Sequence, residues 1–243
     1  LEAKSTIGIS SDGDLTGLNT VDLASSAAST SGDLASATST ATTLQGAELG
    51  SETTIGGVGT IGGQVDFGGS AAATNVTGNA QATGELSTLA QGLSTLTNSG
   101  KTSDGDIYGT TISSDATVQG FANLNTSADA STTAGEADAD AKGASIDGAQ
   151  LGDLSIGGVG TVTGSANFAA AANAANVTGG FLNAANANAE VTSVDGLDSD
   201  GIDVSSDAGI QGLASIDLAS AAESTGAAGS TTSAIATSNA GTL

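Results

Sequence analysis

Small or apolar residues alternate with polar ones along several segments of this chain. Residues 63–67 read Gly-Gln-Val-Asp-Phe, and residues 163–168 read Thr-Gly-Ser-Ala-Asn-Phe. Successive side chains of a β-strand point to opposite faces of the sheet, so this spacing of two predicts half-buried strands. Asp-Gly pairs, which are typical of turns, occur at positions 12–13, 104–105, 147–148 and 195–196.

Helices are disfavoured by the residue types that fill most of the chain. Gly, Thr, Val and Ile occur throughout, and each Gly costs about 1 kcal/mol in a helix interior. The Ala-rich runs 24–41 and 169–175 are ambiguous, because Ala favours helix whereas the interleaved Ser, Thr and Asn do not. We therefore predict an all-β fold.

Parts of the sequence return at a fixed offset. The segment Ile-Gly-Gly-Val-Gly-Thr at 55–60 reappears at 156–161, 101 positions later. The same offset relates Phe67 to Phe168, and it relates Asn-Val-Thr-Gly at 75–78 to the same four residues at 176–179. Several collinear matches of this kind indicate an architecture of stacked copies.

Two kinds of module alternate within this repeat. Module X contains Ser-Ser-Asp, at 10–12, 113–115 and 205–207. Module Y contains Gly-Gly-Val, at 56–58 and 157–159. The order X-Y-X-Y-X predicts a first repeat over 1–101, a second over 102–201, and a terminal half repeat with module X alone over 202–243.

Two β architectures fit the pattern. A β-solenoid has a narrow interior that Ala, Val, Ile, Leu, Ser and Thr can fill. Tandem β-sandwich domains of about 100 residues would match the repeat length. Facing sheets of a sandwich lie about 10 Å apart, and four Phe and one Tyr supply little bulk for such a core. We favour the β-solenoid-like array and keep the tandem sandwich as the alternative.

Composition restricts the chemistry of the chain. The net charge is −23, and Cys, His, Pro, Met and Trp are absent. Such acidity approaches that of disordered chains, but the repeats keep their apolar positions. The charge repels phosphate backbones, so we expect no nucleic-acid partner. No run of 18 apolar residues occurs, so we expect no membrane insertion.

Catalysis is not expected from these residue types. Without His, the chain can form neither a Ser-His pair nor a His-based metal site. Paired carboxylates can hydrolyse glycosides, but aromatic platforms and basic residues for binding a sugar are nearly missing. We therefore expect no enzyme activity and no required cofactor.

Acidic residues gather at the repeat boundaries and make Ca²⁺ the one candidate ligand. Ca²⁺ takes six to eight oxygen ligands from closely spaced carboxylates and carbonyls. Asp198-Ser-Asp200-Gly resembles the start of an EF-hand loop, although its Gly arrives early and no final Glu follows. A solvated acidic turn is the simpler interpretation. The candidate ligands are Asp104, Asp106, Asp195, Asp198, Asp200 and Asp203.

Three Asn-x-Ser/Thr sequons begin at Asn75, Asn125 and Asn176. In a secreted protein they would be glycosylation acceptors on the surface. The alternative is that these Asn residues form hydrogen-bonded ladders along strand edges.

Self-assembly is the function that this pattern favours. Strand arrays expose unpaired N–H and C=O groups at both ends, and clustered Lys or Pro usually blocks such edges. Here Pro is absent, Lys and Arg total three, and both terminal modules are of type X. Head-to-tail pairing that does not close gives a filament, so the expected partner is the chain itself. The expected assembly residues are Ile7, Leu15, Leu18, Val21, Ile210, Leu213, Ile216 and Leu218.

We expect an extracellular or cell-surface protein, after removal of a signal peptide that this chain does not contain. The few Lys and Arg leave few trypsin sites, and the acidic, Cys-free, repetitive composition resembles bacterial and archaeal surface proteins. A non-polymerising adhesin or stalk domain is the alternative. Ice binding is less favoured, because Thr-x-Thr occurs only sporadically, as at 161–163.

Overall fold

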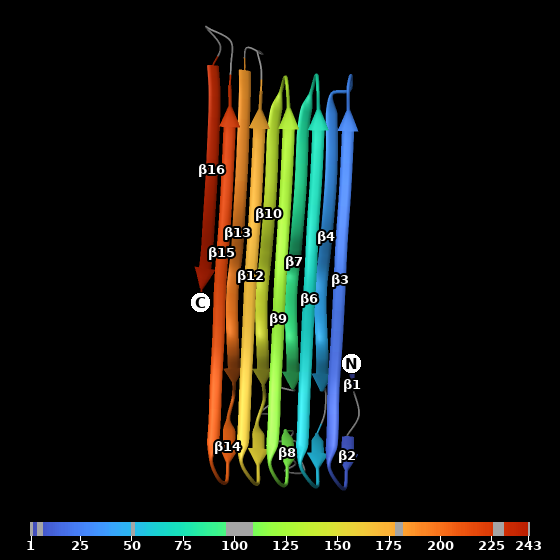
Figure 1. Ribbon diagram of the computed structural model, residues 1–243, viewed down its shortest axis with the longest axis vertical. Coiled ribbons are helices and arrows are strands. Elements are labelled where there is room, and N and C mark those ends of the chain that lie inside the picture. Colours follow the sequence, from blue (N-terminus) through green and yellow to red (C-terminus); the bar gives the residue numbers. More distant parts are fainter. Residues whose placement is uncertain are drawn as a thin grey trace, which may run out of the picture.

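The computed structural model describes residues 2–3, 7–49, 52–95, 109–177, 182–225 and 231–242. These residues form β-strands without a helix, in three parallel sheets (Figure 1). The chain winds repeatedly through the three sheets in the same order, which is a flattened β-solenoid. The all-β and solenoid predictions are thereby confirmed.

Two sheets of long strands face each other. The front sheet contains β3 (Gly13–Ser29), β6 (Gly59–Asn75), β9 (Ala116–Thr132), β12 (Gly160–Asn176) and β15 (Ala208–Ser224). The rear sheet contains β1 (Glu2–Ala3), β4 (Leu34–Leu49), β7 (Asn79–Thr95), β10 (Glu136–Leu151), β13 (Leu182–Ser199) and β16 (Thr231–Thr242).

A short base sheet closes one end of the flattened section. It contains β2 (Ile7–Ile9), β5 (Thr53–Ile55), β8 (Thr110–Ile112), β11 (Leu154–Ile156) and β14 (Ile202–Val204). One coil is a base strand, a front strand and a rear strand in that order, so coil 1 is β2-β3-β4 and coil 5 is β14-β15-β16.

The strand register explains the sequence repeat. Gly59 pairs with Ala116, and Ala116 pairs with Gly160, so the 101-residue offset spans two coils rather than one. Module X therefore marks coils 1, 3 and 5, and module Y marks coils 2 and 4. The three parts inferred from the sequence are consecutive segments of one stack, and the sheets run through all of them.

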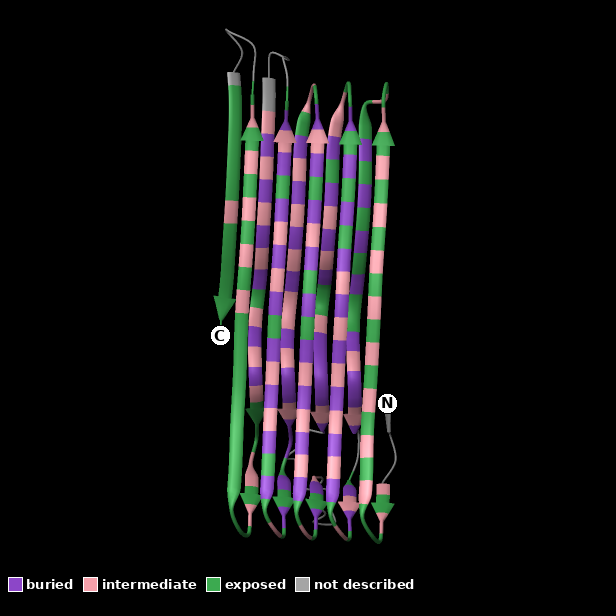
Figure 2. Cartoon of the chain, viewed as in Figure 1, coloured by how far each residue is buried: buried purple, intermediate pink, exposed green. Residues whose placement is uncertain are grey.

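Burial alternates along the long strands, as the spacing of two predicted (Figure 2). Ala fills the interior near the turns that join front to rear strands, at Ala71, Ala128 and Ala172 in front and Ala80, Ala137 and Ala185 behind. The ambiguous run 169–175 is thus strand, and the run 24–41 is strand on both sides of the turn at 30–33. Every second residue of these strands faces the other sheet, where the small side chain of Ala lets the two sheets pack closely.

Larger side chains occupy one interior column farther along the strands. This column contains Val21, Phe67, Leu124, Phe168 and Ile216. Phe168 is 1% exposed, and a Cβ built on Gly143 of the rear sheet would lie 2.6 Å from its ring. A large residue from one sheet therefore faces a residue without a side chain from the other.

A line of glycines crosses the interior below that column. We call it the glycine waist. It consists of Gly17, Gly63, Gly120, Gly164 and Gly212 in the front sheet and Gly46, Gly92, Gly148 and Gly196 in the rear sheet. A Cβ on Gly63 would lie 2.0 Å from the Gly92 carbonyl oxygen. The backbones of the two sheets thus touch, and the waist separates the Ala- and Phe-filled core from a second core of Ile, Leu and Val at the base.

Candidate functional site

The acidic residues proposed as Ca²⁺ ligands do not converge in the part of the chain that the structure describes. Asp104 and Asp106 lie outside that part. Asp195 and Asp198 belong to strand β13, Asp200 follows it, and Asp203 lies in β14. The described residues contain no group of three or more His, Cys, Asp or Glu side chains that could hold a metal. Ca²⁺ binding remains a prediction from the sequence alone.

One carboxylate among the acidic residues of the rear sheet stands out. Asp147 pairs in register with Asp195 of the next coil. Burial, together with the nearby charges of Asp195 and Asp198, raises the pKa of Asp147 to about 6. The sequence signal for this pair was the Asp-Gly dipeptide, which occurs at 147–148 and again one coil later at 195–196.

We expect Asp147→Asn to stabilise the protein at neutral pH. The pKa of Asp147 is higher in the folded chain than its ordinary value of 3.8, so its contribution to stability is complete below that value and is lost as pH rises through about 6. Asp147 is half-buried, so solvent screening limits the gain to about 1 kcal/mol, or roughly 2–4 °C in melting temperature.

The measurement is a series of thermal melts between about pH 4 and about pH 7. The matched control is Asp217→Asn, which removes one charge from an exposed position on β15. An equal gain in both variants would mean that net charge, rather than the surroundings of Asp147, sets the pH dependence.

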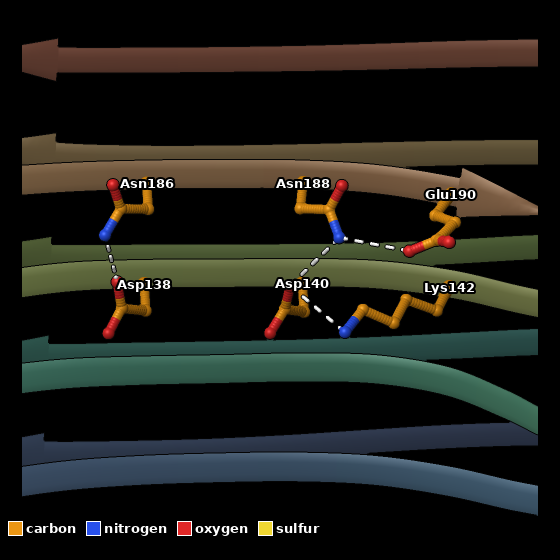
Figure 3. Close-up of polar contacts among 6 residues, drawn as sticks. All are labelled: Asp138, Asp140, Lys142, Asn186, Asn188 and Glu190. Atoms are coloured by element: carbon orange, nitrogen blue, oxygen red, sulfur yellow. Dashed lines mark hydrogen bonds and ion pairs between the residues drawn. The ribbon is translucent and has the colours of Figure 1, made fainter. Parts of the chain in front are cut away.

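The outer face of the rear sheet carries a polar groove between strands β4, β7, β10, β13 and β16. Figure 3 shows the polar contacts of β10 and β13 that line it. Asn186 Nδ2 donates to Asp138 Oδ1 at 2.7 Å, and Asn188 Nδ2 lies 3.4 Å from Asp140 Oδ1. Lys142 Nζ lies 3.4 Å from that same carboxylate oxygen. In this groove, Asp138 and Asp140 of β10 thus face amides of β13 rather than carboxylates, which avoids like charges on adjacent strands at these two positions.

A longer ladder of the same kind crosses the outer face of the front sheet. Asn123 donates to Asp66 at 3.1 Å, Asn167 donates to Asn123 at 2.8 Å, and Ser215 donates to Asn167 at 3.0 Å. These bonds run along the stacking axis through four coils. They link neighbouring coils through side chains in addition to the backbone pairing of the sheet.

The turns between base and front strands also alternate from coil to coil. Asp12 of a Ser-Ser-Asp turn accepts from the backbone N–H of Val58 in the next coil at 2.8 Å. Asp115 accepts from Val159 in the same way, also at 2.8 Å. Modules X and Y are therefore two turn types that fit each other, with Y always bonded to the X coil before it.

Two of the three sequon asparagines are interior. Asn75 and Asn176 are each 1% exposed. The Asn75 amide nitrogen donates to the Gly32 carbonyl at 3.1 Å, and that of Asn176 donates to the Gly135 carbonyl. Burial in the folded chain argues against glycans at both positions and favours the ladder interpretation. Asn125 is exposed on the outer front face, so a glycan there remains a prediction.

The predicted assembly residues lie on the terminal coils. Leu15 and Val21 on β3, with Ile210, Ile216 and Leu218 on β15, occupy columns that are interior in the middle coils. Ile7 lies on the edge strand β2 of the base sheet. Leu18 and Leu213 point outward instead and are 68% and 51% exposed. The prediction therefore combined residues of the open ends with residues of the outer face.

Both ends of the described stack are strand edges. In the front sheet the edge strands are β3 and β15, each 17 residues long. In the rear sheet β4 pairs with the two residues of β1 over Glu48 and Leu49 only, and β16 forms the other edge. Figure 2 shows the exposed and half-buried residues of these strands at the two sides of the stack.

Comparison with protein-family models, curated proteins and solved structures found no match to this chain. The described residues also include no helix that is long and apolar enough to cross a membrane.

Proposed function

We propose that this chain is a structural subunit that assembles end to end into a filament or a surface appendage. The observation that carries the proposal is the pair of open strand edges, each backed by apolar interior columns. The proposed extracellular location rests on composition alone. The partner in this proposal is a second copy of the chain, and the proposal includes neither catalysis nor a cofactor.

The interior columns of the two terminal coils match each other closely. Following the register, Ile210 of coil 5 corresponds to Leu15 of coil 1, Ile216 corresponds to Val21, and Leu218 corresponds to Leu23. Ser220 and Ala222 correspond to Ser25 and Ala27 in the same way. A second copy placed on coil 5 would therefore continue each of these five columns with a residue of similar size and polarity.

Such stacking would pair the backbone groups of the edge strand and bury the apolar residues of the end coil. An edge strand of 17 residues leaves a row of backbone N–H and C=O groups that a further parallel strand can pair. The same contact would bury the apolar residues of the end, such as Ile210, which is 52% exposed. Apolar burial contributes roughly 25 cal/mol per Å², so long edges favour association.

An inward charge on the last coil tests this proposal. We expect Ile216→Asp to shift the protein from large assemblies to monomers in sedimentation velocity, because a carboxylate would be buried at the joint without a partner. The matched control is Ser215→Asp, which places the same charge on the outward face of the same strand. Equal assembly by both variants would contradict end-to-end stacking, whereas a parent protein that stays monomeric would favour a stalk or adhesin domain.

A further inference from the structure

The turns between base and front strands restrict which type of coil can stack on the next. Each Gly-Gly-Val turn donates to the Ser-Ser-Asp turn before it through its backbone. In coil 2, Gly56 donates to the Ile9 carbonyl at 2.7 Å, Gly57 donates to the Ser11 carbonyl at 3.1 Å, and Val58 donates to the Asp12 carboxylate. Coil 4 repeats all three bonds on coil 3, at 2.8, 3.1 and 2.8 Å.

Only glycine fits on top of a Ser-Ser-Asp turn. A Cβ on Gly57 would lie 2.2 Å from Asp12 Oδ1 and 2.7 Å from the Asp12 backbone nitrogen. A Cβ on Gly158 would lie 2.2 Å from Asp115 Oδ1 and 2.8 Å from the Asp115 nitrogen. The same exclusion therefore occurs twice, at equivalent positions two coils apart.

The third Ser-Ser-Asp turn lies on coil 5, at the far end of the described stack. Its backbone joins the coil before it, since Ser205 donates to the Ile156 carbonyl at 2.9 Å and Gly160 donates to the Asp207 carbonyl at 2.9 Å. The Asp207 side chain is exposed. It occupies the position from which Asp12 and Asp115 bond the coil that follows them.

We propose that the coil 5 end selects a β-solenoid coil whose turn carries two glycines, with Asp207 accepting from the backbone N–H after them. This inference rests on the proposed function, since it requires that the coil 5 end pairs with another coil. An unmodified second copy presents Ser10 and Ser11 at these positions. Their Cβ atoms would meet the contacts that Gly56 and Gly57 avoid, so a joint between identical copies is weaker than the X-to-Y joints within the chain.

The test converts the first turn of the full chain to the glycine type while keeping Asp12. We expect Ser10→Gly/Ser11→Gly to lower the dissociation constant for end-to-end association about tenfold, the change that one hydrogen bond to a charged group gives. Adding Asp207→Ala to the same chain should return the association to the level of the parent. Sedimentation velocity over a concentration series measures both.

The outcomes separate this inference from the proposed function. If the parent assembles and the glycine variant assembles no better, or if its gain survives Asp207→Ala, the selection rule is wrong and end-to-end assembly stands. If neither protein assembles, both are wrong. If only the glycine variant assembles, the rule holds, and the unmodified chain does not polymerise on its own.

A second pair of variants checks the rule inside the chain, where assembly plays no part. We expect Gly57→Ser to lower the melting temperature, because the added Cβ meets the backbone and carboxylate of Asp12. Ser114→Gly changes the equivalent turn position of coil 3 in the opposite direction and should have little effect. Equal melting temperatures for Gly57→Ser and the parent would overturn the exclusion on which the inference depends.

Discussion

Gly63→Ala is expected to destabilise the protein by about 3 kcal/mol or more. The added Cβ would lie 2.0 Å from the Gly92 carbonyl oxygen and 2.7 Å from its carbonyl carbon. Backbone atoms of a sheet cannot move aside as the end of a flexible side chain can. The front and rear sheets would therefore separate at the glycine waist and disturb the cores on both sides of it. Chemical denaturation followed by circular dichroism measures the loss.

The neighbouring residue provides the matched control. Gly62 lies on the same strand but points outward, and a Cβ there would lie 3.4 Å from a methyl group of Thr16. Gly62→Ala should be neutral or slightly stabilising, because Ala restricts the unfolded chain without a clash. Similar losses in the two variants would show that the effect comes from removing a strand glycine and not from contact between the sheets.

Phe168→Ala is expected to cost about 3–5 kcal/mol. Phe168 is fully buried, and it faces Gly143, which cannot fill the space that the ring would leave. Phe168→Leu should recover most of the stability, since Leu124 occupies the same column one coil earlier. Both losses can be measured by denaturant titration of the purified variants.

Phe121→Ala is the control for this prediction. Phe121 is half-buried and belongs to the outward-facing residues of β9, next to the glycine waist. Loss of its ring leaves no cavity between the sheets, so the expected effect is below about 1 kcal/mol. A Phe121→Ala loss as large as that of Phe168→Ala would mean that aromatic bulk stabilises the outer face as strongly as the interior.

The fold was largely predictable because the interior is repetitive. The alternation around Val65 and Phe67, together with the scarcity of aromatic residues, indicated a narrow β-solenoid. The sequence alone did not reveal the length of one coil. Successive coils start 46, 57, 44 and 48 residues apart in register, so the strongest self-similarity appeared at two coils instead of one.

Features that depend on the register between strands could not be predicted from the sequence. The glycine waist appears only when Gly63, Gly120 and Gly164 are aligned strand by strand, and the chain contains many other glycines. For the sequons at Asn75 and Asn176, glycosylation and hydrogen-bonded ladders both stayed open, because no local pattern shows that the front strand ends there with an inward side chain. The acidic boundary at 195–203 was interpreted as a turn, although Asp195 and Asp198 continue strand β13.

The turns between base and front strands were visible as sequence motifs, but the hydrogen bonds between them were not. The Ser-Ser-Asp and Gly-Gly-Val segments defined modules X and Y from the start. Their physical relation, an Asp12 carboxylate bonded to the Val58 backbone of the next coil, required the coils to be stacked. Modules X and Y therefore alternate in a way that lets each Y turn bond the X turn of the coil before it. This alternation accounts for the two-coil repeat.

The most direct test of end-to-end assembly is electron microscopy of the purified 243-residue chain at neutral pH. We expect unbranched filaments one solenoid wide, with strands perpendicular to the filament axis and a repeat of about 4.8 Å along it. Short single rods at every protein concentration would contradict it.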